Sequence, residues 1–193
     1  MSNLYIIAGC NGAGKTTASY TILPEILNCK EFINADEIAK GISPFQPEKV
    51  SILAGRIMLK RIDELLNQQV DFAIETTLTT LSYRKAIALA RSKGYQIILL
   101  YFWLNDVMLA IERVKIRVLE GGHHIPEDVI VRRYYKGISN LINVFTSLCD
   151  YWIVIDNSIK PYYIITTGKS DVDIKVMNNE VWNRIINLTD GKH

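Results

Sequence analysis

Cysteine and surplus charge are both scarce in this sequence. Its 193 residues include three cysteines, an odd number without metal-binding spacing, which argues against a disulfide scaffold and a zinc site and favours a reducing compartment. The formal net charge is +2 with both signs interspersed, so composition gives no reason to expect a nucleic-acid partner. An ordinary globular protein is the expected class.

Long apolar runs are missing as well. No stretch approaches the roughly 18 consecutive apolar residues of a membrane span, and the first residues lack the basic leader of a signal peptide. Internal repeats, low-complexity tracts and linkers are absent too, while 49% of the residues are hydrophobic. We therefore expect one cytoplasmic domain over residues 1–193, with a sizeable core and no membrane partner.

One glycine-rich stretch stands out against this background. The apolar run Leu4–Ala8 is followed by Gly9-Cys10-Asn11-Gly12-Ala13-Gly14-Lys15-Thr16, which fits G-x-x-x-x-G-K-[ST] at each fixed position. Glycines let successive backbone N–H groups converge on a phosphate, and the following helix adds its positive N-terminal end. A chance glycine-rich turn would not need this strand before it and this helix after it. The stretch predicts a nucleoside triphosphate site.

The expected ligands of this loop are ATP and Mg²⁺. Lys15 can reach the β- and γ-phosphates, and the Thr16 hydroxyl can ligate Mg²⁺. The residues expected to bind the nucleotide are Gly9, Asn11, Gly12, Ala13, Gly14, Lys15, Thr16 and Thr17. Cys10 is either an oxidisable thiol or, in keeping with the inertness of most cysteines, a tolerated small residue.

Strands and helices are expected to alternate along the rest of the chain. The predicted strands are 4–8, 31–34, 71–75, 96–104 and 151–155, followed by a hairpin of 162–167 and 172–176. The predicted helices are 15–23, 35–39, 47–69, 82–93, 105–120, one from Pro126 onward, and a short C-terminal one. This order predicts an α/β fold with a mostly parallel sheet flanked by helices and a ligand at the carboxyl ends of the strands.

Polar residues follow the ends of two predicted strands and should gather at one edge. Asn34 and Asp36 follow the second strand, while Glu75 and Thr76 end the third. A carboxylate such as Asp36 can accept the proton of an attacking hydroxyl, although it could instead cap the following helix. Glu75 could hold the acceptor or waters around Mg²⁺, because an acidic residue ending an apolar strand needs partners. These residues are candidate acceptor-site groups.

The predicted helix 105–120 carries two arginines beside its core stripe of Val107, Ile111, Val114 and Val118. Arg113 and Arg117 lie four residues apart, where like charges repel mildly unless an anion lies between them. A surface ion pair of Arg117 with Glu120 is the alternative. We favour two lid arginines, because guanidinium groups suit phosphate.

The segment Gly121-Gly122-His123-His124 links this helix to the next and suggests a lid over about 106–135. Glycines permit hinge motion there, and lids exclude water from phosphoryl-transfer sites. With one further histidine in the chain and no cysteine nearby, a zinc site is not expected. His123 is a candidate phosphate contact. Arg132 and Arg133 are further candidates, and at least one of them should face solvent.

Together these segments resemble the zeta-toxin family of P-loop kinases, in particular its short bacterial branch. The matching stretches cover roughly residues 4–158 and read GCNGAGKTT, FINADEIA, FAIETTL, RVKIRVLEGGHHIPEDVIVRRY and DYWIVIDNS. The resemblance implies a kinase-like P-loop fold and transfer of the ATP γ-phosphate to a sugar hydroxyl. For characterised zeta toxins the acceptor is UDP-N-acetylglucosamine, phosphorylated on the 3′-hydroxyl of its amino sugar. It also implies a toxin whose protein partner is an antitoxin.

The resemblance assigns roles by position. Lys15 and Thr16 hold phosphate and Mg²⁺, and Asp36 matches the general base. Glu75 and Thr76 match the acid and hydroxyl of the acceptor side, and Arg113 or Arg117 matches a lid arginine. The second lid arginine of long zeta toxins has no direct counterpart here, so a histidine, Arg117 or Arg132 takes its place or transfer is slower.

Two alternatives stay open. The first keeps phosphate transfer but changes the acceptor to an antibiotic, a nucleoside or an RNA hydroxyl. The second is a non-catalytic ATP-binding switch that acts through a protein partner and predicts ATP binding without turnover.

Overall fold

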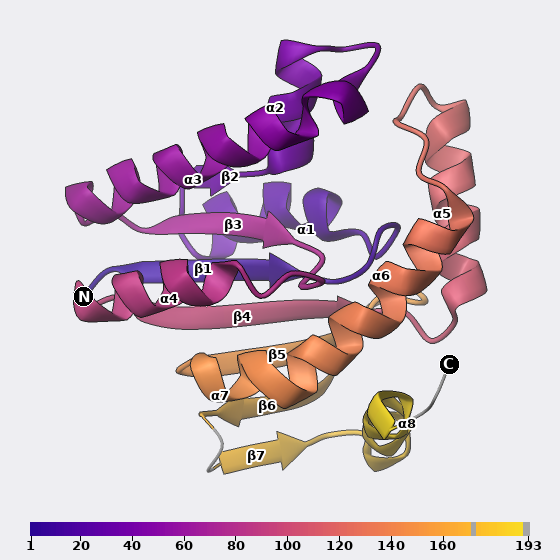
Figure 1. The fold of residues 1–193 in the computed structure, drawn as a ribbon. Helices are drawn as coiled ribbons and strands as arrows, with labels where there is room; N and C mark the ends of the chain where they lie inside the picture. The colour runs from indigo at the N-terminus through magenta and orange to yellow at the C-terminus, as the bar shows by residue number, and fades with distance from the viewer. Residues whose placement is uncertain (171–172, 191–193) are drawn as a thin grey trace.

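One seven-stranded sheet organises the residues that this computed structural model describes, 1–170 and 173–190 (Figure 1). Its strands are β1 (Asn3–Ala8), β2 (Glu31–Ile33), β3 (Phe72–Thr76), β4 (Gln96–Trp103), β5 (Tyr151–Asp156), β6 (Tyr163–Lys169) and β7 (Asp173–Val176). Their order is β2-β3-β1-β4-β5-β6-β7, and the first five are parallel, whereas β6 and β7 each run antiparallel to the preceding strand. The predicted parallel α/β sheet with a C-terminal hairpin is confirmed.

Helical segments pack on both faces of this sheet (Figure 1). They are α1 (Lys15–Thr21), η1 (Ile22–Ile26), α2 (Ala35–Ile42), η2 (Pro47–Val50), α3 (Ser51–Gln68), α4 (Tyr83–Ser92), α5 (Val107–Leu119), α6 (Glu127–Asn140), η3 (Leu141–Phe145), α7 (Thr146–Leu148) and α8 (Asn179–Asp190). Within the described residues, none of these helices combines the length and apolarity needed to cross a membrane.

Several element ends differ from the sequence prediction. The helical conformation does not stop near Pro24. Helix α1 continues into the π-helical turn η1, which includes Pro24 and ends with a hydrogen bond from the Leu27 N–H to the Ile22 carbonyl. Helix α5 begins after Asp106 rather than Asn105, since the Asp106 carboxylate accepts a hydrogen bond from the Met108 N–H at 2.9 Å. In the hairpin β6 extends to Lys169, and residues 171–172 of the prediction lie outside the described part.

Strand register brings distant segments together at the carboxyl edge. In the β1–β3 pair, Ile7 lies opposite Glu75 and Ala8 lies opposite Thr76. The end of β3 therefore lies beside the start of the glycine-rich loop. Large buried side chains on neighbouring strands, such as Trp103 of β4, fill the core beneath this edge. The edge is thus a rigid platform for whatever binds there.

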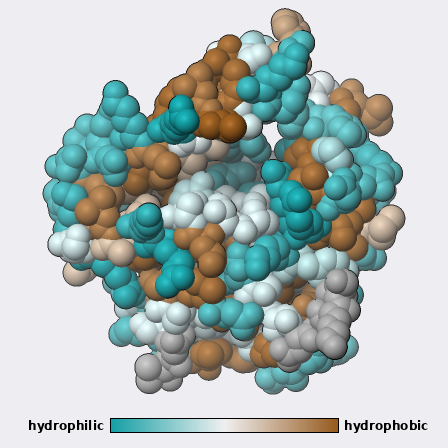
Figure 2. All heavy atoms as spheres, viewed as in Figure 1, coloured by the Kyte–Doolittle hydropathy of each residue, from teal (hydrophilic) through white to brown (hydrophobic). Residues whose placement is uncertain are grey.

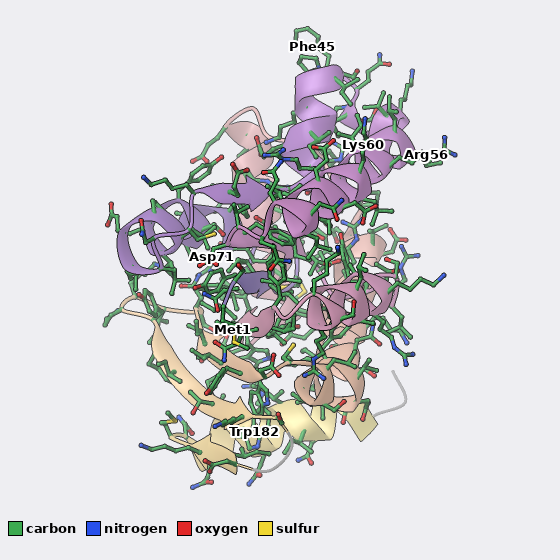
Figure 3. The ribbon with its side chains drawn as sticks, turned by 90° about the vertical axis from the view of Figure 1, so that its left-hand side faces the viewer. Met1, Phe45, Arg56, Lys60, Asp71 and Trp182 are labelled. Atoms are coloured by element: carbon green, nitrogen blue, oxygen red, sulfur yellow. The ribbon has the colours of Figure 1, made fainter. Side chains whose placement is uncertain are left out.

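Two helical units rise beside this edge (Figure 1). One is the arm formed by α2, η2 and α3, and the other is the pair of α5 and α6. Figure 2 shows the molecular face hollowed between them. Phe45 stands out from the tip of the arm, where it is 95% exposed (Figure 3). The arm and the α5–α6 pair thus flank this hollow (Figure 2).

Candidate active site

The glycine-rich loop, residues 9–14, bends the chain from β1 directly into α1. Gly14 precedes the helix with φ of +82°, a left-handed conformation that glycine adopts without strain. Among the described residues no side chain caps α1, whereas Asn34 caps α2 and Asp106 caps α5. The helices α3, α4 and α6 likewise begin without a side-chain cap, so it is the glycine-rich loop before α1 that sets this helix start apart.

Glu75 is the centre of the hydrogen-bond network beside this loop. Its carboxylate accepts from Thr16 Oγ1 at 2.8 Å on Oε2 and from Asn34 Nδ2 at 3.0 Å on the same oxygen. Lys15 Nζ lies 3.6 Å from Glu75 Oε1 and donates to the Cys10 carbonyl at 2.9 Å. The Lys15 and Glu75 side chains are only 7% and 9% exposed. The structure thus brings together four residues that the sequence analysis singled out.

Asn34 rather than Asp36 caps α2. Asn34 Oδ1 accepts from the Asp36 N–H at 2.8 Å and from the Glu37 N–H at 3.4 Å. The capping role considered for Asp36 is therefore filled by its neighbour, and Asp36 is exposed in the first turn of α2. Its negative charge acts electrostatically on both Tyr83 and Arg133. The Asp36 carboxylate is therefore exposed and lies near the side chains of Tyr83 and Arg133.

Tyr83, the first residue of α4, was not anticipated from the sequence because no motif marks it. Burial raises the pKa of its phenol; the hydrogen bond with Thr76 opposes this shift, and the Asp36 charge adds to it. The Tyr83 hydroxyl also lies 3.5 Å from Met58 Sδ. Thr76 is buried and its Oγ1 accepts from the Leu78 N–H at 3.0 Å. Tyr83 therefore contacts the buried Thr76 and lies near the charge of Asp36.

The two predicted lid arginines of α5 differ in their surroundings. Arg113 donates from Nη1 to the Asn157 carbonyl at 2.9 Å and from Nη2 to the Ser158 carbonyl at 2.8 Å. Arg117 is half-buried, and its Nε has no hydrogen-bond partner within the described residues. Arg113 is thus engaged with the backbone after β5.

On α6, Arg133 rather than Arg132 faces the glycine-rich loop. Arg133 Nη1 donates to Asn11 Oδ1 at 3.0 Å, whereas the Arg132 side chain is exposed. Burial lowers the pKa of Arg133; the Asp36 charge opposes this shift, and the Arg132 charge adds to it. Arginine stays protonated in proteins, so a fixed positive charge lies between the loop and Asp36.

The loop between α5 and α6, predicted to belong to a lid, reaches towards the arm formed by α2, η2 and α3. His123 Nδ1 lies 3.7 Å from Glu48 Oε2 of η2. His124 is exposed and lines an apolar cavity of about 260 Å³ between α5 and α6. Gly121, with φ of +87°, and Gly122 close the C-terminal end of α5, where the Gly122 N–H donates to the Arg117 carbonyl at 2.8 Å. These glycines complete a helix end, and hinge motion stays a prediction.

The sequence model of the zeta toxin family matches residues 2–160. The chain belongs to the zeta toxin family. An uncharacterized protein of Haemophilus influenzae is 32% identical over 126 residues, which are 65% of this chain and 88% of that protein. The resemblance expected from the sequence motifs is confirmed.

Solved structures reproduce the fold of this zeta toxin family member. A chain of the AvrRxo1-ORF1:-ORF2 complex solved with ATP has a TM-score of 0.79 at 16% identity, over 96% of this chain and 63% of that chain. A chain of the PezAT toxin–antitoxin system of Streptococcus pneumoniae has a TM-score of 0.65 at 16% identity, over 98% of this chain and 85% of that chain. At these identities the likeness establishes the fold alone. The family member thus spans less than two thirds of the AvrRxo1 chain.

The oxygen atoms at this family member's site suit Mg²⁺. Thr16 Oγ1 and the Glu75 carboxylate lie side by side, and hard cations prefer such oxygen ligands. Within the described residues no group of three or more histidine, cysteine, aspartate or glutamate side chains forms a metal cage. The hydroxyl oxygen of Thr16 and the carboxylate of Glu75 would fit Mg²⁺, which keeps waters and phosphate oxygens in the rest of its shell.

Cys10 of the glycine-rich loop is buried. The side chain is 3% exposed, and burial raises its pKa to about 11, although the Lys15 charge acts in the opposite direction. The thiolate is the reactive form of cysteine, so this thiol is poorly suited to oxidation. Of the two alternatives for Cys10, the structure favours the inert small residue.

Proposed function

We propose that this chain transfers the γ-phosphate of ATP to a hydroxyl of a small-molecule acceptor with the help of Mg²⁺. The observation that carries this proposal is the Glu75 network. It joins Lys15 and Thr16 of the glycine-rich loop to Asn34, whose side chain caps the helix that begins beside Asp36. Hydrogen bonds and one ion pair thereby connect the expected nucleotide-binding residues Lys15 and Thr16 to the start of the helix that carries the candidate base Asp36. Phosphoryl transfer requires such fixed relative positions.

Each group has a proposed part in the reaction. The glycine-rich loop and the open N-terminus of α1 bind the phosphates, and Lys15 and Arg133 offset the negative charge of the transferred group. The oxygen of the acceptor hydroxyl bonds to the γ-phosphorus, and the bond between that phosphorus and the ADP oxygen breaks. Asp36 accepts the proton that the hydroxyl loses. Thr16 and Glu75 are the residues that would hold Mg²⁺, which would supply neutralisation of the phosphate charge when bound.

The acceptor we propose is a nucleotide sugar such as UDP-N-acetylglucosamine. Family membership supports this choice, and Asn34, Glu75 and Thr76 are the residues we propose as candidate contacts of the acceptor. We also propose an antitoxin protein as partner, because one structural neighbour is a chain of the PezAT toxin–antitoxin system. Asp36, Arg117 and His123 stay candidate contacts of the acceptor and of the transferred phosphate, whereas the exposure of Arg132 favours Arg133 in the place first considered for Arg132.

Mass spectrometry tests the reaction. Incubation of the protein with Mg²⁺-ATP and UDP-N-acetylglucosamine should yield ADP and a sugar nucleotide carrying one more phosphate. ATP hydrolysis without this product would remove that acceptor, and a screen of antibiotics, nucleosides and RNA with labelled ATP would then identify the class. ATP binding with neither hydrolysis nor transfer would instead support the non-catalytic switch.

A pair of variants separates the two adjacent arginines of α6. Arg133→Gln should raise the KM for ATP or lower kcat/KM by about 10–50-fold, the cost of losing a charge-assisted hydrogen bond near the phosphates. Arg132→Gln removes the same charge from an exposed position and should change kcat/KM by less than about threefold. Steady-state kinetics with the accepted substrate measures both. A larger effect at Arg132 would contradict the placement of Arg133.

A further inference from the structure

The loop after β5, which begins with Asn157 and Ser158, lies against the glycine-rich loop although more than 140 residues separate them in sequence. Asn157 is 5% exposed, and its Nδ2 donates to the Ala13 carbonyl at 2.8 Å. Its Oδ1 accepts from Lys160 Nζ at 3.2 Å. Because a lysine only donates and a carbonyl only accepts, these two partners determine which end of the amide faces Ala13.

This contact controls one peptide group of the phosphate-binding loop. The Ala13 carbonyl and the Gly14 N–H belong to the same planar peptide unit, in which they point in opposite directions. The hydrogen bond from Asn157 directs this carbonyl towards the segment that follows β5. The Gly14 N–H is therefore turned away from that segment, towards the side where a phosphate would bind.

Gly14 allows this approach. A Cβ atom at position 14 would lie 2.5 Å from Asn157 Nδ2, a distance that non-bonded atoms do not tolerate. The amide of Asn157 thus packs directly on the backbone of Gly14, which also has φ of +82°. Two separate demands, the left-handed conformation and the space for Asn157, are met by the same glycine.

Arg113 of α5 holds the loop after β5 in this position. Its two terminal nitrogens donate to the successive carbonyls of Asn157 and Ser158, at 2.9 Å and 2.8 Å. Helix α5 also packs closely on the glycine-rich loop, since a Cβ at Gly12 would lie 2.7 Å from the Ala110 carbonyl oxygen. The guanidinium therefore acts on the glycine-rich loop through Asn157.

The loop after β5 is held from its other side as well. The Asp156 carboxylate accepts from the Ser158 N–H at 2.8 Å and from the Tyr163 hydroxyl at 2.9 Å. Ser158 Oγ accepts from the Asn105 N–H at 2.8 Å. With these supports Asn157 has little freedom to move away when the glycine-rich loop binds its ligand.

We propose that Asn157 is a positioning residue of the ATP site, which orients the Ala13–Gly14 peptide towards phosphate, and that Arg113 acts by holding Asn157. This inference rests on the proposed function only in requiring that the loop bind ATP. It does not depend on the acceptor or on transfer. Binding can therefore test it even where no product forms.

The test compares Asn157→Asp with Asn143→Asp. The first change keeps the side-chain size but turns a carboxylate oxygen, which cannot donate, towards the Ala13 carbonyl. The second adds the same charge at an exposed position of η3. Titration calorimetry with Mg²⁺ and a non-hydrolysable ATP analogue should give a Kd at least about tenfold higher for Asn157→Asp. Asn143→Asp should stay within about twofold of the wild type.

Thermal unfolding of the same samples separates positioning from general damage. We expect Asn157→Asp to weaken analogue binding in protein that still unfolds cooperatively. An Asn157→Asp protein that folds and binds the analogue within about twofold of wild type would overturn the proposal. So would wild-type protein that does not bind the analogue, which would also contradict the proposed function.

Arg113→Lys gives a second measurement that remains available if Asn157→Asp does not fold. A lysine cannot donate to both carbonyls with the fork geometry of arginine, so the analogue Kd should rise. The second change is Asn157→Ser, because a serine side chain is too short to reach the Ala13 carbonyl. Arg113→Lys and Asn157→Ser are measured singly and combined in one double variant. Because both changes act through the same contact, their effects should be less than additive. Fully additive effects would overturn the role assigned to Arg113.

Discussion

Replacing Asp36 with asparagine is expected to lower the turnover number of phosphate transfer by about 10²–10⁴-fold, the range that general acid–base catalysis contributes. Asparagine has nearly the same size and can still hydrogen-bond an acceptor hydroxyl, but it cannot take the proton. The product assay with saturating Mg²⁺-ATP and acceptor measures the change. The effect should therefore appear in kcat far more than in KM.

The structure explains why this substitution should be selective. Asn34 caps α2, so the change at Asp36 leaves the start of the helix intact. Asp36 is also exposed and outside the Glu75 network, so ATP affinity should stay within about threefold. Asp63→Asn, an exposed site on α3, provides the matched control for loss of one negative charge. Transfer retained in Asp36→Asn would rule out this general base.

Local sequence patterns predicted the parts of the site that depend on strand ends. The glycine-rich loop follows β1, and Glu75 lies in β3, the neighbour of β1 in the sheet. Carboxyl ends of parallel strands meet at one edge, so the approach of Glu75 to Lys15 and Thr16 follows from strand order and register alone. The same reasoning placed Asn34 and Asp36, because β2 is the next strand along this edge.

Residues on helices were harder to place. Adjacent positions on a helix point about 100° apart, so the choice between Arg132 and Arg133 depends on how α6 is rotated against the sheet. That rotation is set by buried residues such as Tyr134, whose hydroxyl donates to the Leu104 carbonyl. The contact of Asn157 with Ala13 likewise depends on the packing of β5 against the loop, which no local pattern encodes.

Replacing Glu75 with glutamine should impair transfer and stability together. The Glu75 carboxylate receives hydrogen bonds from Thr16 and Asn34 and lies beside the Lys15 ammonium, so three donor groups point at it. Glutamine has the same shape, but its amide NH₂ would face one of these donors and it has no charge to offset Lys15. The free energy of unfolding should fall by about 1–3 kcal/mol, measured by urea denaturation.

The catalytic effect of this change should depend on Mg²⁺. We expect the transfer rate to fall by about 10²–10³-fold, the cost of removing one preorganised electrostatic group. The Mg²⁺ concentration for half-maximal rate should rise by about 10–100-fold, as when a partner of a metal ligand is lost. Glu64→Gln on α3 removes an exposed carboxylate paired with Arg61 and should alter stability by less than about 1 kcal/mol.

A Mg²⁺ titration separates the two roles that Glu75 can have. If its carboxylate only neutralises Lys15 in the free protein, Glu75→Gln loses stability while the half-maximal Mg²⁺ concentration stays unchanged. If it also holds the Thr16 hydroxyl towards the metal, both quantities change, because one oxygen, Oε2, lies 2.8 Å from Thr16 Oγ1. We expect both to change, since the side chain that neutralises the lysine is the one that orients the threonine.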